Sequence, residues 1–435
     1  MQISNIKILN VITIFVTISI LLPLAGDNLP YIIRSHHLWA MIWLYSLILF
    51  NLKLLENRII IYCLLYGLLF FILLNTLWYD VDKVMKVHIL REFYDILLAL
   101  SIIMYYRIKK DYKGLATLVK LSLYFIIITA VMSIITSFMN PTYTRDITHV
   151  GTLDPFIAKY TLSYKKYGGA NYSYASAFVT IIPIFFYYIV NNKMSFLNKR
   201  ILIIFVGVIY ITLIRIQLFA NILISSIIII LCLLGSNNVK KGKYLIIIAI
   251  IIVLMIPLDH FIDMLHYLGD FFDSDSILYE KFNDLAKFLR AGGYDETGTG
   301  ARAARYPLLL DSFISNPLSG GRDWDFHLYW MNKLAVFGLL GVIPFLILNA
   351  IYFQYNIQDF NRDFKFYYFL SISSVVVLGL MKAVVGIELW FVVFVVLPGS
   401  YYLQIFSKSN SNDNKIKIND DHNSLEETVN KMTSP

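Results

Sequence analysis

Arg215 occupies the position in the sequence that points most directly to chemistry. It interrupts the apolar stretch 201–234, which is too long for one membrane-spanning helix and about right for two. We therefore expect Arg215 at the turn of a tight helical hairpin or slightly below it. A guanidinium group at that depth is costly unless it pairs with an anion, which makes Arg215 a candidate binding residue. The alternative is a turn residue whose side chain snorkels to the interface and marks the helix end.

The long polar segment 258–331 carries further candidate cations. Arg302 and Arg305 lie three residues apart, so on a helix they would present two guanidinium groups on one face, as bidentate phosphate recognition requires. Arg322 is a further candidate for binding an anionic substrate. His327 lies just before the next apolar run, where an imidazole can accept a proton or donate to a phosphate near neutral pH. A solvated face or an interfacial polar residue is the alternative for each.

Carboxylates in the same segment are candidate general bases. Asp323 and Asp325 form a D-x-D pair, a form that can hold a divalent metal. Because this spacing is common by chance in an acidic segment, we expect no metal site. We retain Asp323, Asp325 and Glu296 as candidate bases.

A second polar segment, 140–171, ends in another candidate element. Lys165 and Lys166 add positive charge for an anionic headgroup, and Gly169 permits close backbone approach just before Asn171. An ordinary turn flanked by lysines is an equally good interpretation of these residues.

The composition indicates what must position these side chains. Of 435 residues, 58% are hydrophobic and 15% are charged, and the mean hydropathy is +0.65, well above the balance typical of a soluble protein. Because lipid offers no partners for open backbone polar groups, repeated apolar runs predict an all-α polytopic membrane protein. The formal charge of +8 comes mostly from short clusters beside those runs, so it indicates topology and not nucleic-acid binding. Cys63 and Cys232 lie inside apolar segments and supply neither a disulfide framework nor a metal cluster.

About twelve membrane spans are expected, and the first is expected to be a retained helix, not a cleaved signal peptide. Lysines and arginines in alternate loops place those loops and both termini in the cytoplasm, and the segments 140–171 and 258–331 outside. The expected spans are 8–25, 38–55, 59–78, 92–106, 115–139, 172–190, 201–214, 217–234, 244–257, 332–353, 366–381 and 387–406.

The domain organisation follows from these spans. We expect a helical bundle over 1–406, a large extracytoplasmic loop at 258–331 inserted in it, and a disordered cytoplasmic tail at 407–435. Within the loop, apolar residues at helical spacing predict two short amphipathic helices at 277–290 and 302–314, lying over the bundle at the membrane surface.

Three groups of residues occur in an order that resembles a known family. The first is Tyr167-Gly-Gly-Ala-Asn171 followed by an apolar span, and the second is Arg215. The third runs from Arg302 through Pro-x-x-Gly at 317–320 and His327 to Gly-x-x-Gly at 338–341. Together they resemble the O-antigen polymerase and O-antigen ligase superfamily of bacterial envelope glycosyltransferases, over roughly residues 165–350.

The chain departs from that pattern in three places. Ile214 stands where Ser is usual, Ile216 where Gly is common, and Leu328 replaces an Asn after the histidine. The roles of that Ser and Asn therefore do not carry over to this chain.

The resemblance implies a GT-C-like fold and a membrane glycosyltransferase that uses lipid-linked sugars. A glycan would pass from an undecaprenyl-diphosphate donor to a sugar hydroxyl at the outer face of the bacterial cytoplasmic (inner) membrane. Because the diphosphate is a good leaving group once its charge is matched, positioning and electrostatics should dominate. We expect Arg215 and Arg302 to grip the diphosphate, with Arg305 or the lysines at 165–166 assisting.

We expect residues of the polar segment 258–331 to carry out the proton transfer. His327 would orient the diphosphate or deprotonate the acceptor, with Asp323, Asp325 and Glu296 as competing bases. Attack opposite the leaving group would invert the anomeric centre without a metal or other cofactor. The expected partners are the lipid-linked donor and acceptor and membrane lipid, with a chain-length regulator protein as a candidate; nucleic acid is not expected.

Several functions remain open at this point. Polymerisation of O-antigen, capsule or related repeat units is favoured because the chain is somewhat long and the ligase-like His-Asn pair is incomplete. An O-antigen ligase would move the finished glycan to lipid A core. A transporter or flippase of lipid-linked sugars would instead have charges along a route through the bilayer and two related halves, neither of which is evident. An envelope scaffold would tolerate loss of Arg215 or His327.

Overall fold

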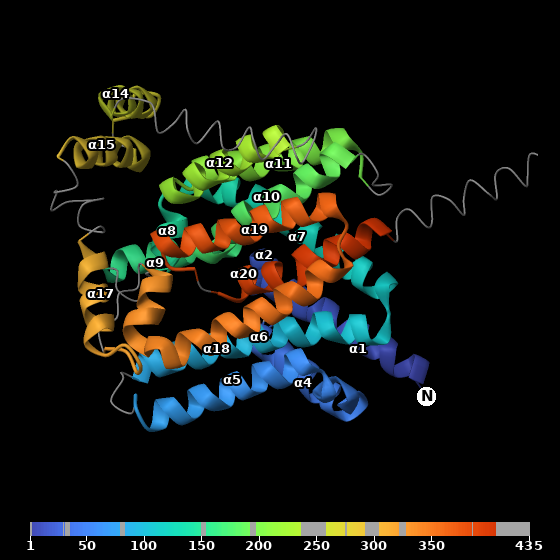
Figure 1. Cartoon of the computed structure of the whole chain (residues 1–435). Helices are drawn as coiled ribbons and strands as arrows, with labels where there is room; N and C mark the ends of the chain where they lie inside the picture. Colours follow the sequence, from blue (N-terminus) through green and yellow to red (C-terminus); the bar gives the residue numbers. More distant parts are fainter. Residues whose placement is uncertain are drawn as a thin grey trace, which may run out of the picture.

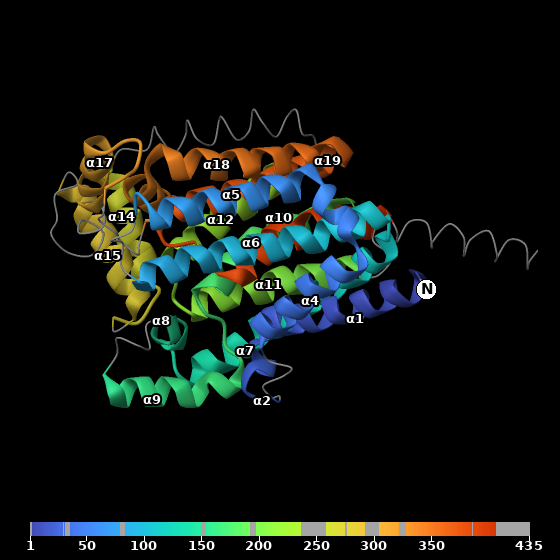
Figure 2. The same cartoon turned by 90° about the horizontal axis from the view of Figure 1, so that it is seen from below.

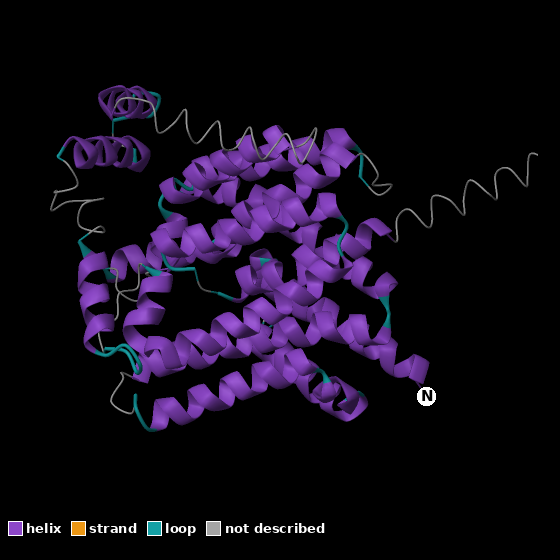
Figure 3. Ribbon diagram, in the orientation of Figure 1, coloured by secondary structure: helices purple, strands orange, loops and turns teal. Residues whose placement is uncertain are grey.

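The computed structural model describes most of the chain, and within the described ranges it is helical and contains no strand (Figure 3). The structure describes residues 2–28, 30, 35–78, 83–148, 154–191, 197–235, 258–274, 276–291, 304–321, 328–384 and 386–405.

Helices occupy every range expected to span the membrane except 244–257, which lies outside the described residues. The helices of the bundle are α1 (Gln2–Leu21), α4 (His36–Phe50), α5 (Arg58–Asn75), α6 (Lys83–Lys109), α7 (Tyr112–Met139), α10 (Tyr172–Asn191), α11 (Lys199–Arg215), α12 (Phe219–Gly235), α18 (Tyr329–Asp359), α19 (Arg362–Met381) and α20 (Ile387–Phe391), which continues through a π-helical turn (Val392–Val396). The shorter helices are α2 (Pro23–Asn28), α8 (Tyr143–Thr148), α9 (Pro155–Tyr164), α14 (Leu258–Gly269), α15 (Ile277–Arg290) and α17 (Arg305–Ser315), with single 3-10 turns at Leu52–Glu56 and Lys165–Tyr167.

Six helices in the described ranges are long and apolar enough to cross a membrane. The prediction of an all-helical protein with several membrane-spanning helices is therefore confirmed, whereas the count of twelve crossings stays a prediction. The six are Arg58–Asn75, Tyr112–Met139, Tyr172–Asn191, Tyr329–Asp359, Arg362–Met381 and Ile387–Ile405; Lys7–Leu21, His36–Phe50 and Phe219–Gly235 are apolar but shorter.

The long helices run side by side, and the short helices other than α2 gather at one end of the bundle (Figures 1 and 2). We name this the loop end; it carries α8, α9, α14, α15 and α17, whereas the N-terminus lies at the opposite end. The described parts of the polar segments 140–171 and 258–331 thus lie at the same end.

The short helices of the loop end were only partly predicted. The amphipathic helix expected at 277–290 is present as α15. The one expected at 302–314 is present as α17 from Arg305, and residues 301–303 lie outside the described ranges. Helix α14 was missed because its sequence continues directly from an apolar run; it packs on α15 through Ile262, Leu265 and Ala286.

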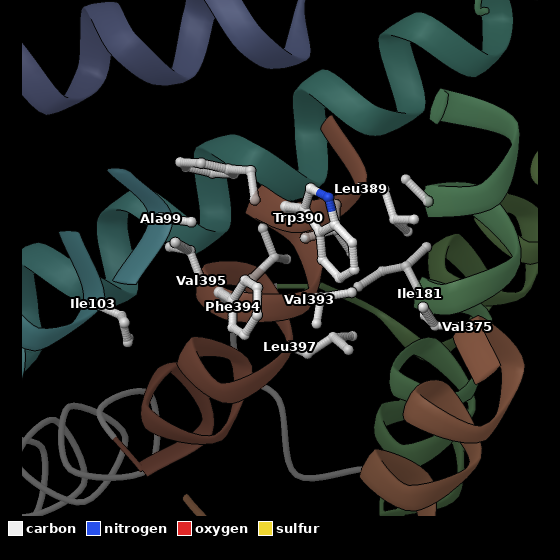
Figure 4. Close-up of a cluster of buried hydrophobic side chains, with 14 of the residues drawn as sticks. Ala99, Ile103, Ile181, Val375, Leu389, Trp390, Val393, Phe394, Val395 and Leu397 are labelled. Atoms are coloured by element: carbon white, nitrogen blue, oxygen red, sulfur yellow. The ribbon is translucent and has the colours of Figure 1, made fainter. Parts of the chain in front are cut away.

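The core of the bundle surrounds α10 and the helix that starts at Ile387. Trp390, Val393 and Phe394 are buried between side chains of the neighbouring helices, such as Ala99 of α6 and Ile181 of α10 (Figure 4). A helix that is apolar on all sides is expected in such a central position. Its first residues therefore lie inside the protein, where each polar group needs a partner.

Helix α18 is broken at Gly338, whose backbone has φ 56 and ψ −162. The break frees two backbone N–H groups, and the preceding loop satisfies both. Leu339 N donates to Pro317 O at 2.9 Å, and Leu340 N donates to Leu318 O at 3.0 Å. The chain before α18 thus docks into its break, and the first turns of α18 stand beside α17 (Figure 1).

The glycines of the Pro-x-x-Gly and Gly-x-x-Gly elements are explained by this docking. A Cβ on Gly338 would lie 2.5 Å from Gly320 N and from Leu318 O. A Cβ on Gly320, at φ 81, would lie 2.3 Å from Val336 O. Both glycines combine a left-handed backbone with a contact that leaves no room for a side chain.

We expect Gly338→Ala to destabilise the protein by about 2–5 kcal/mol, the sum of left-handed strain and overpacking. Thermal unfolding of the purified protein in detergent measures this effect. Gly207→Ala is the matched control, because no atom lies within 4 Å of a Cβ there and alanine is the better helix former by up to about 1 kcal/mol. Equal unfolding temperatures for the two variants would contradict the docking of 316–321 into α18.

Candidate functional site

The site residues predicted from the sequence fall into two groups. Half of them belong to ranges that the structure describes: Lys165, Lys166, Gly169, Asn171, Arg215 and Arg305. The others lie outside the described residues, and their predicted roles stay predictions: Glu296, Arg302, Arg322, Asp323, Asp325 and His327.

Arg215 is the last residue of α11, in the hairpin that the sequence predicted. Gln217, in the left-handed region at φ 55, makes the turn into α12. The guanidinium of Arg215 lies 4.2 Å from the centre of the Phe138 ring, at the end of α7. Its Nε is buried and has no acceptor among the described residues. An unsatisfied buried donor on a charged group costs free energy, and a bound anion that accepts its hydrogen bond would offset that cost.

A second unpaired donor lies on the same hairpin, in the first turn of α12. Asn221 is fully buried, and its Oδ1 accepts a hydrogen bond from Lys382 Nζ at 2.5 Å. Because only the amide oxygen can accept from an ammonium, this bond fixes the orientation of the amide. Asn221 Nδ2 then faces a place where no described residue accepts from it.

Lys382 brings a second positive charge to the hairpin from the end of α19. Its Nζ also lies 5.5 Å from the centre of the Tyr172 ring, on α10. Tyr306 of α17 donates a hydrogen bond to Leu380 O, so this end of α19 lies at the loop end. We name Arg215, Asn221 and Lys382 the donor group.

Asn171 joins the N-terminus of α10 to the first turn of α20. Its Oδ1 accepts hydrogen bonds from the backbone N–H of Ser173 at 2.9 Å and of Tyr174 at 3.1 Å, an N-cap arrangement. Its Nδ2 donates to Glu388 Oε1 at 3.3 Å. The structure thus places Asn171 against a carboxylate that the sequence did not single out.

The glycines before Asn171 have a packing role. Gly168 adopts φ 72, and a Cβ there would lie 2.6 Å from the backbone of Leu24. A Cβ on Gly169 would lie 2.7 Å from the ring of Tyr143. The close approach predicted for this turn is thus an approach to α2 and α8.

The lysines at 165 and 166 and Arg305 lie at the loop end. Lys165 and Lys166 are exposed on the 3-10 turn after α9, and Lys166 Nζ lies 5.2 Å from the centre of the Tyr167 ring. Arg305 is the half-buried first residue of α17. Because Arg302 is outside the described ranges, the pairing of the two arginines stays a prediction.

A largely buried ion pair near the start of α18 was not predicted. Lys333 Nζ lies 2.9 Å from Glu92 Oε2, across α18 and α6. Tyr329 Oη donates to the other oxygen of Glu92. Both carboxylate oxygens of Glu92 therefore have donors, and this pair ties the segment that follows His327 in the sequence to the bundle.

Asp95 lies one helical turn after Glu92 and is 2% exposed. Its Oδ1 has no hydrogen-bond donor among the described residues. The charges of Arg91, Glu388 and Glu92 act on it, and α6 packs against α20. We name Asp95, Asn171 and Glu388 the carboxylate group.

The chain from α19 to α20 links the two groups. Lys382 follows α19 directly and belongs to the donor group. Glu388 lies in the first turn of α20 and belongs to the carboxylate group. One end of this short connection contacts the hairpin that carries the unpaired donors Arg215 Nε and Asn221 Nδ2. The other end leads into α20, which packs against the helix that carries the unpaired acceptor Asp95 Oδ1. Such an arrangement can compensate negative charge on one part of a ligand and receive a proton from another part.

In the part of the chain that the structure describes, no three His, Cys, Asp or Glu side chains are grouped so as to hold a metal ion. Compared with protein-family models and with curated proteins, the chain matches none of either.

Proposed function

We propose that the protein is a membrane glycosyltransferase that joins oligosaccharide repeat units carried on undecaprenyl diphosphate. It would act in the bacterial cytoplasmic membrane, with both termini in the cytoplasm and the loop end on the outer face. The basic end of α6, at Arg107 and Lys109, lies opposite the loop end and supports this orientation.

One observation carries the proposal. Arg215 Nε and Asn221 Nδ2 are buried donors on one hairpin without acceptors among the described residues, and Lys382 contacts that hairpin. Each unsatisfied buried donor costs about 1–3 kcal/mol, so a bound anion with several oxygens would remove a substantial penalty. A lipid diphosphate at the membrane surface is such an anion.

The donor group would act on the leaving group. As the bond between the anomeric carbon and the diphosphate breaks, negative charge grows on the diphosphate oxygens, and Arg215 with Lys382 would stabilise it. A preorganised donor in a water-poor site is worth more in the transition state than in water. Attack by the acceptor hydroxyl from the opposite face would invert the anomeric centre.

Glycan transfer is proposed because the sequence resembles the O-antigen polymerase and ligase superfamily. Within that superfamily we prefer polymerisation over ligation. Leu328 stands where the ligase-like pattern has an Asn after the histidine. Both reactions would use the same donor group, so the products distinguish them.

Deletion of the gene, followed by gel analysis of the surface polysaccharide, tests the proposed function. A polymerase predicts caps of a single repeat unit that return to a full ladder when the wild-type gene is restored. Loss of all capped core would indicate a ligase. Loss of surface glycan with lipid-linked repeats retained on the cytoplasmic side would indicate a flippase, and unchanged bands would contradict every envelope glycan role.

We expect a chelator to change the transfer rate of the reconstituted enzyme by less than about twofold. The reason is that Arg215 and Lys382 compensate the charge of the diphosphate in place of a divalent ion. The assay compares initial rates with and without EDTA after metal-free dialysis. Restoration of a lost rate by Mg²⁺ or Mn²⁺ would contradict this part of the proposal.

A further inference from the structure

The transfer reaction leaves one proton from the acceptor hydroxyl that some group must accept. Of the neighbouring carboxylates Glu388, Asp95 and Glu92, Glu388 is the one placed for this task. It lies in the first turn of α20 and is half-buried. Glu92, by contrast, has donors on both oxygens, and Asp95 is 2% exposed.

The two oxygens of Glu388 differ in their surroundings. Asn171 Nδ2 donates to Oε1 at 3.3 Å, and no described residue donates a hydrogen bond to Oε2. Asn171 itself is fixed, because its Oδ1 caps α10 through Ser173 and Tyr174. One oxygen is therefore positioned by the protein, and the other can receive a hydrogen bond from a ligand.

Gly386 allows the backbone to pass close to the unbonded oxygen. Its φ of 117 is a conformation that side chains rarely permit. A Cβ at this position would lie 2.9 Å from Glu388 Oε2 and 2.4 Å from Ser173 Oγ. A residue with a side chain here would thus crowd the carboxylate at the oxygen that would face the ligand.

Asp95 provides a partner for the protonated state. Once Glu388 has taken a proton, its new O–H becomes a hydrogen-bond donor. Asp95 Oδ1 is a buried acceptor without a donor among the described residues, on the helix that packs against α20. A hydrogen bond from that O–H would remove the free-energy penalty of leaving this buried acceptor unsatisfied.

We infer that Glu388 is the general base of the transfer reaction, positioned by Asn171 and backed by Asp95. The inference rests on the proposed function. The acceptor O–H bond breaks and its proton passes to Glu388 as the new bond to the anomeric carbon forms. The bond from that carbon to the diphosphate breaks, and its electron pair leaves on undecaprenyl diphosphate, whose charge the donor group stabilises.

The test uses the full chain in lipid nanodiscs with a labelled undecaprenyl-diphosphate repeat unit. For Glu388→Gln, which keeps the size but accepts no proton, kcat is expected to fall about 100-fold or more while the donor KM stays within about threefold. Glu388→Asp is expected to retain a reduced, measurable rate. Glu56→Gln, an exposed carboxylate at the other end of the bundle, is the matched control.

The pH profile separates a base from a structural carboxylate. The wild-type rate should rise with pH along an acid limb, and Glu388→Gln should lose that limb. The groups that face Glu388 are Asn171 and Tyr174 on α10 and Asp95 on α6. Arg91 and Glu92, also on α6, act on Asp95 in turn. Asp95→Asn should move the limb without removing it, which a purely structural role would not produce.

Each outcome decides one point. A wild-type protein that joins no repeat units contradicts the proposed function itself. An active wild type with an equally active Glu388→Gln contradicts the general base alone. A Glu388→Gln variant that loses donor binding and unfolds at a lower temperature, together with an inactive Glu388→Asp, would assign Glu388 a structural role and overturn the inference.

Discussion

Replacing Arg215 by alanine is expected to reduce polymer formation by about 100-fold or more, as loss of one preorganised donor to a developing oxyanion does. The guanidinium would contact the diphosphate as it leaves, so the loss should appear in kcat as well as in donor binding. Arg215→Lys keeps the charge but not the Nε–H donor, and an intermediate rate is expected. Initial rates of elongation from a labelled lipid-linked repeat measure both effects.

A matched arginine on the same helix serves as the control. Arg200 lies in the first turn of α11, exposed and far from the hairpin. Arg200→Ala should leave the rate within about twofold of wild type, since exposed charges contribute little. Equal rates for Arg215→Ala and Arg200→Ala would show that Arg215 is a snorkelling turn residue.

Lys333→Met is expected to be the most destabilising single substitution near the site. It leaves the largely buried carboxylate of Glu92 without its cation, and removal of one partner from a buried pair costs about 3–5 kcal/mol. Thermal unfolding in detergent, with binding of the lipid-linked donor followed in parallel, measures the effect. The double variant Glu92→Gln with Lys333→Met should recover most of the stability, because no unpaired charge remains.

An exposed lysine controls for the loss of a positive charge. Lys53 lies in the 3-10 turn between α4 and α5, and Lys53→Met should leave the unfolding temperature unchanged. If the double variant is less stable than Lys333→Met alone, the energetic argument for the pair fails.

The helices of this protein were predictable because lipid-facing segments must be apolar and of fixed length. The hairpin at Arg215 follows from that rule, since one arginine divides 201–234 into α11 and α12. Helix α14 was not predictable in the same way. Its apolar residues continue a preceding apolar run, and only its packing on α15 separates it from that run.

Only some residues of the candidate site could be predicted from the sequence. Arg215 and Asn171 could be singled out locally, as a charge in an apolar run and a polar residue before a span. Lys333 meets a carboxylate 241 residues away, and Lys382 meets an amide 161 residues away. No local pattern indicates such pairs, because helix packing alone brings them together.

The glycine elements show that a close approach can be predicted without its partner. Gly169 was expected to permit close backbone approach, and the ring of Tyr143 is what approaches it. Gly320 and Gly338 were part of a resemblance without an assigned role, and they allow a loop to dock into a broken helix. The sequence alone indicates that the backbone is closely approached at these glycines, but it does not identify the group that makes the contact.

The most direct test of glycan transfer is a reconstituted reaction with the purified chain in nanodiscs and one labelled lipid-linked repeat unit. The proposed function predicts products of two or more repeats, with one undecaprenyl diphosphate released for each new glycosidic bond. Arg215→Ala should abolish both signals together. An unchanged repeat unit and no released lipid diphosphate, from a folded wild-type protein, would contradict the proposal.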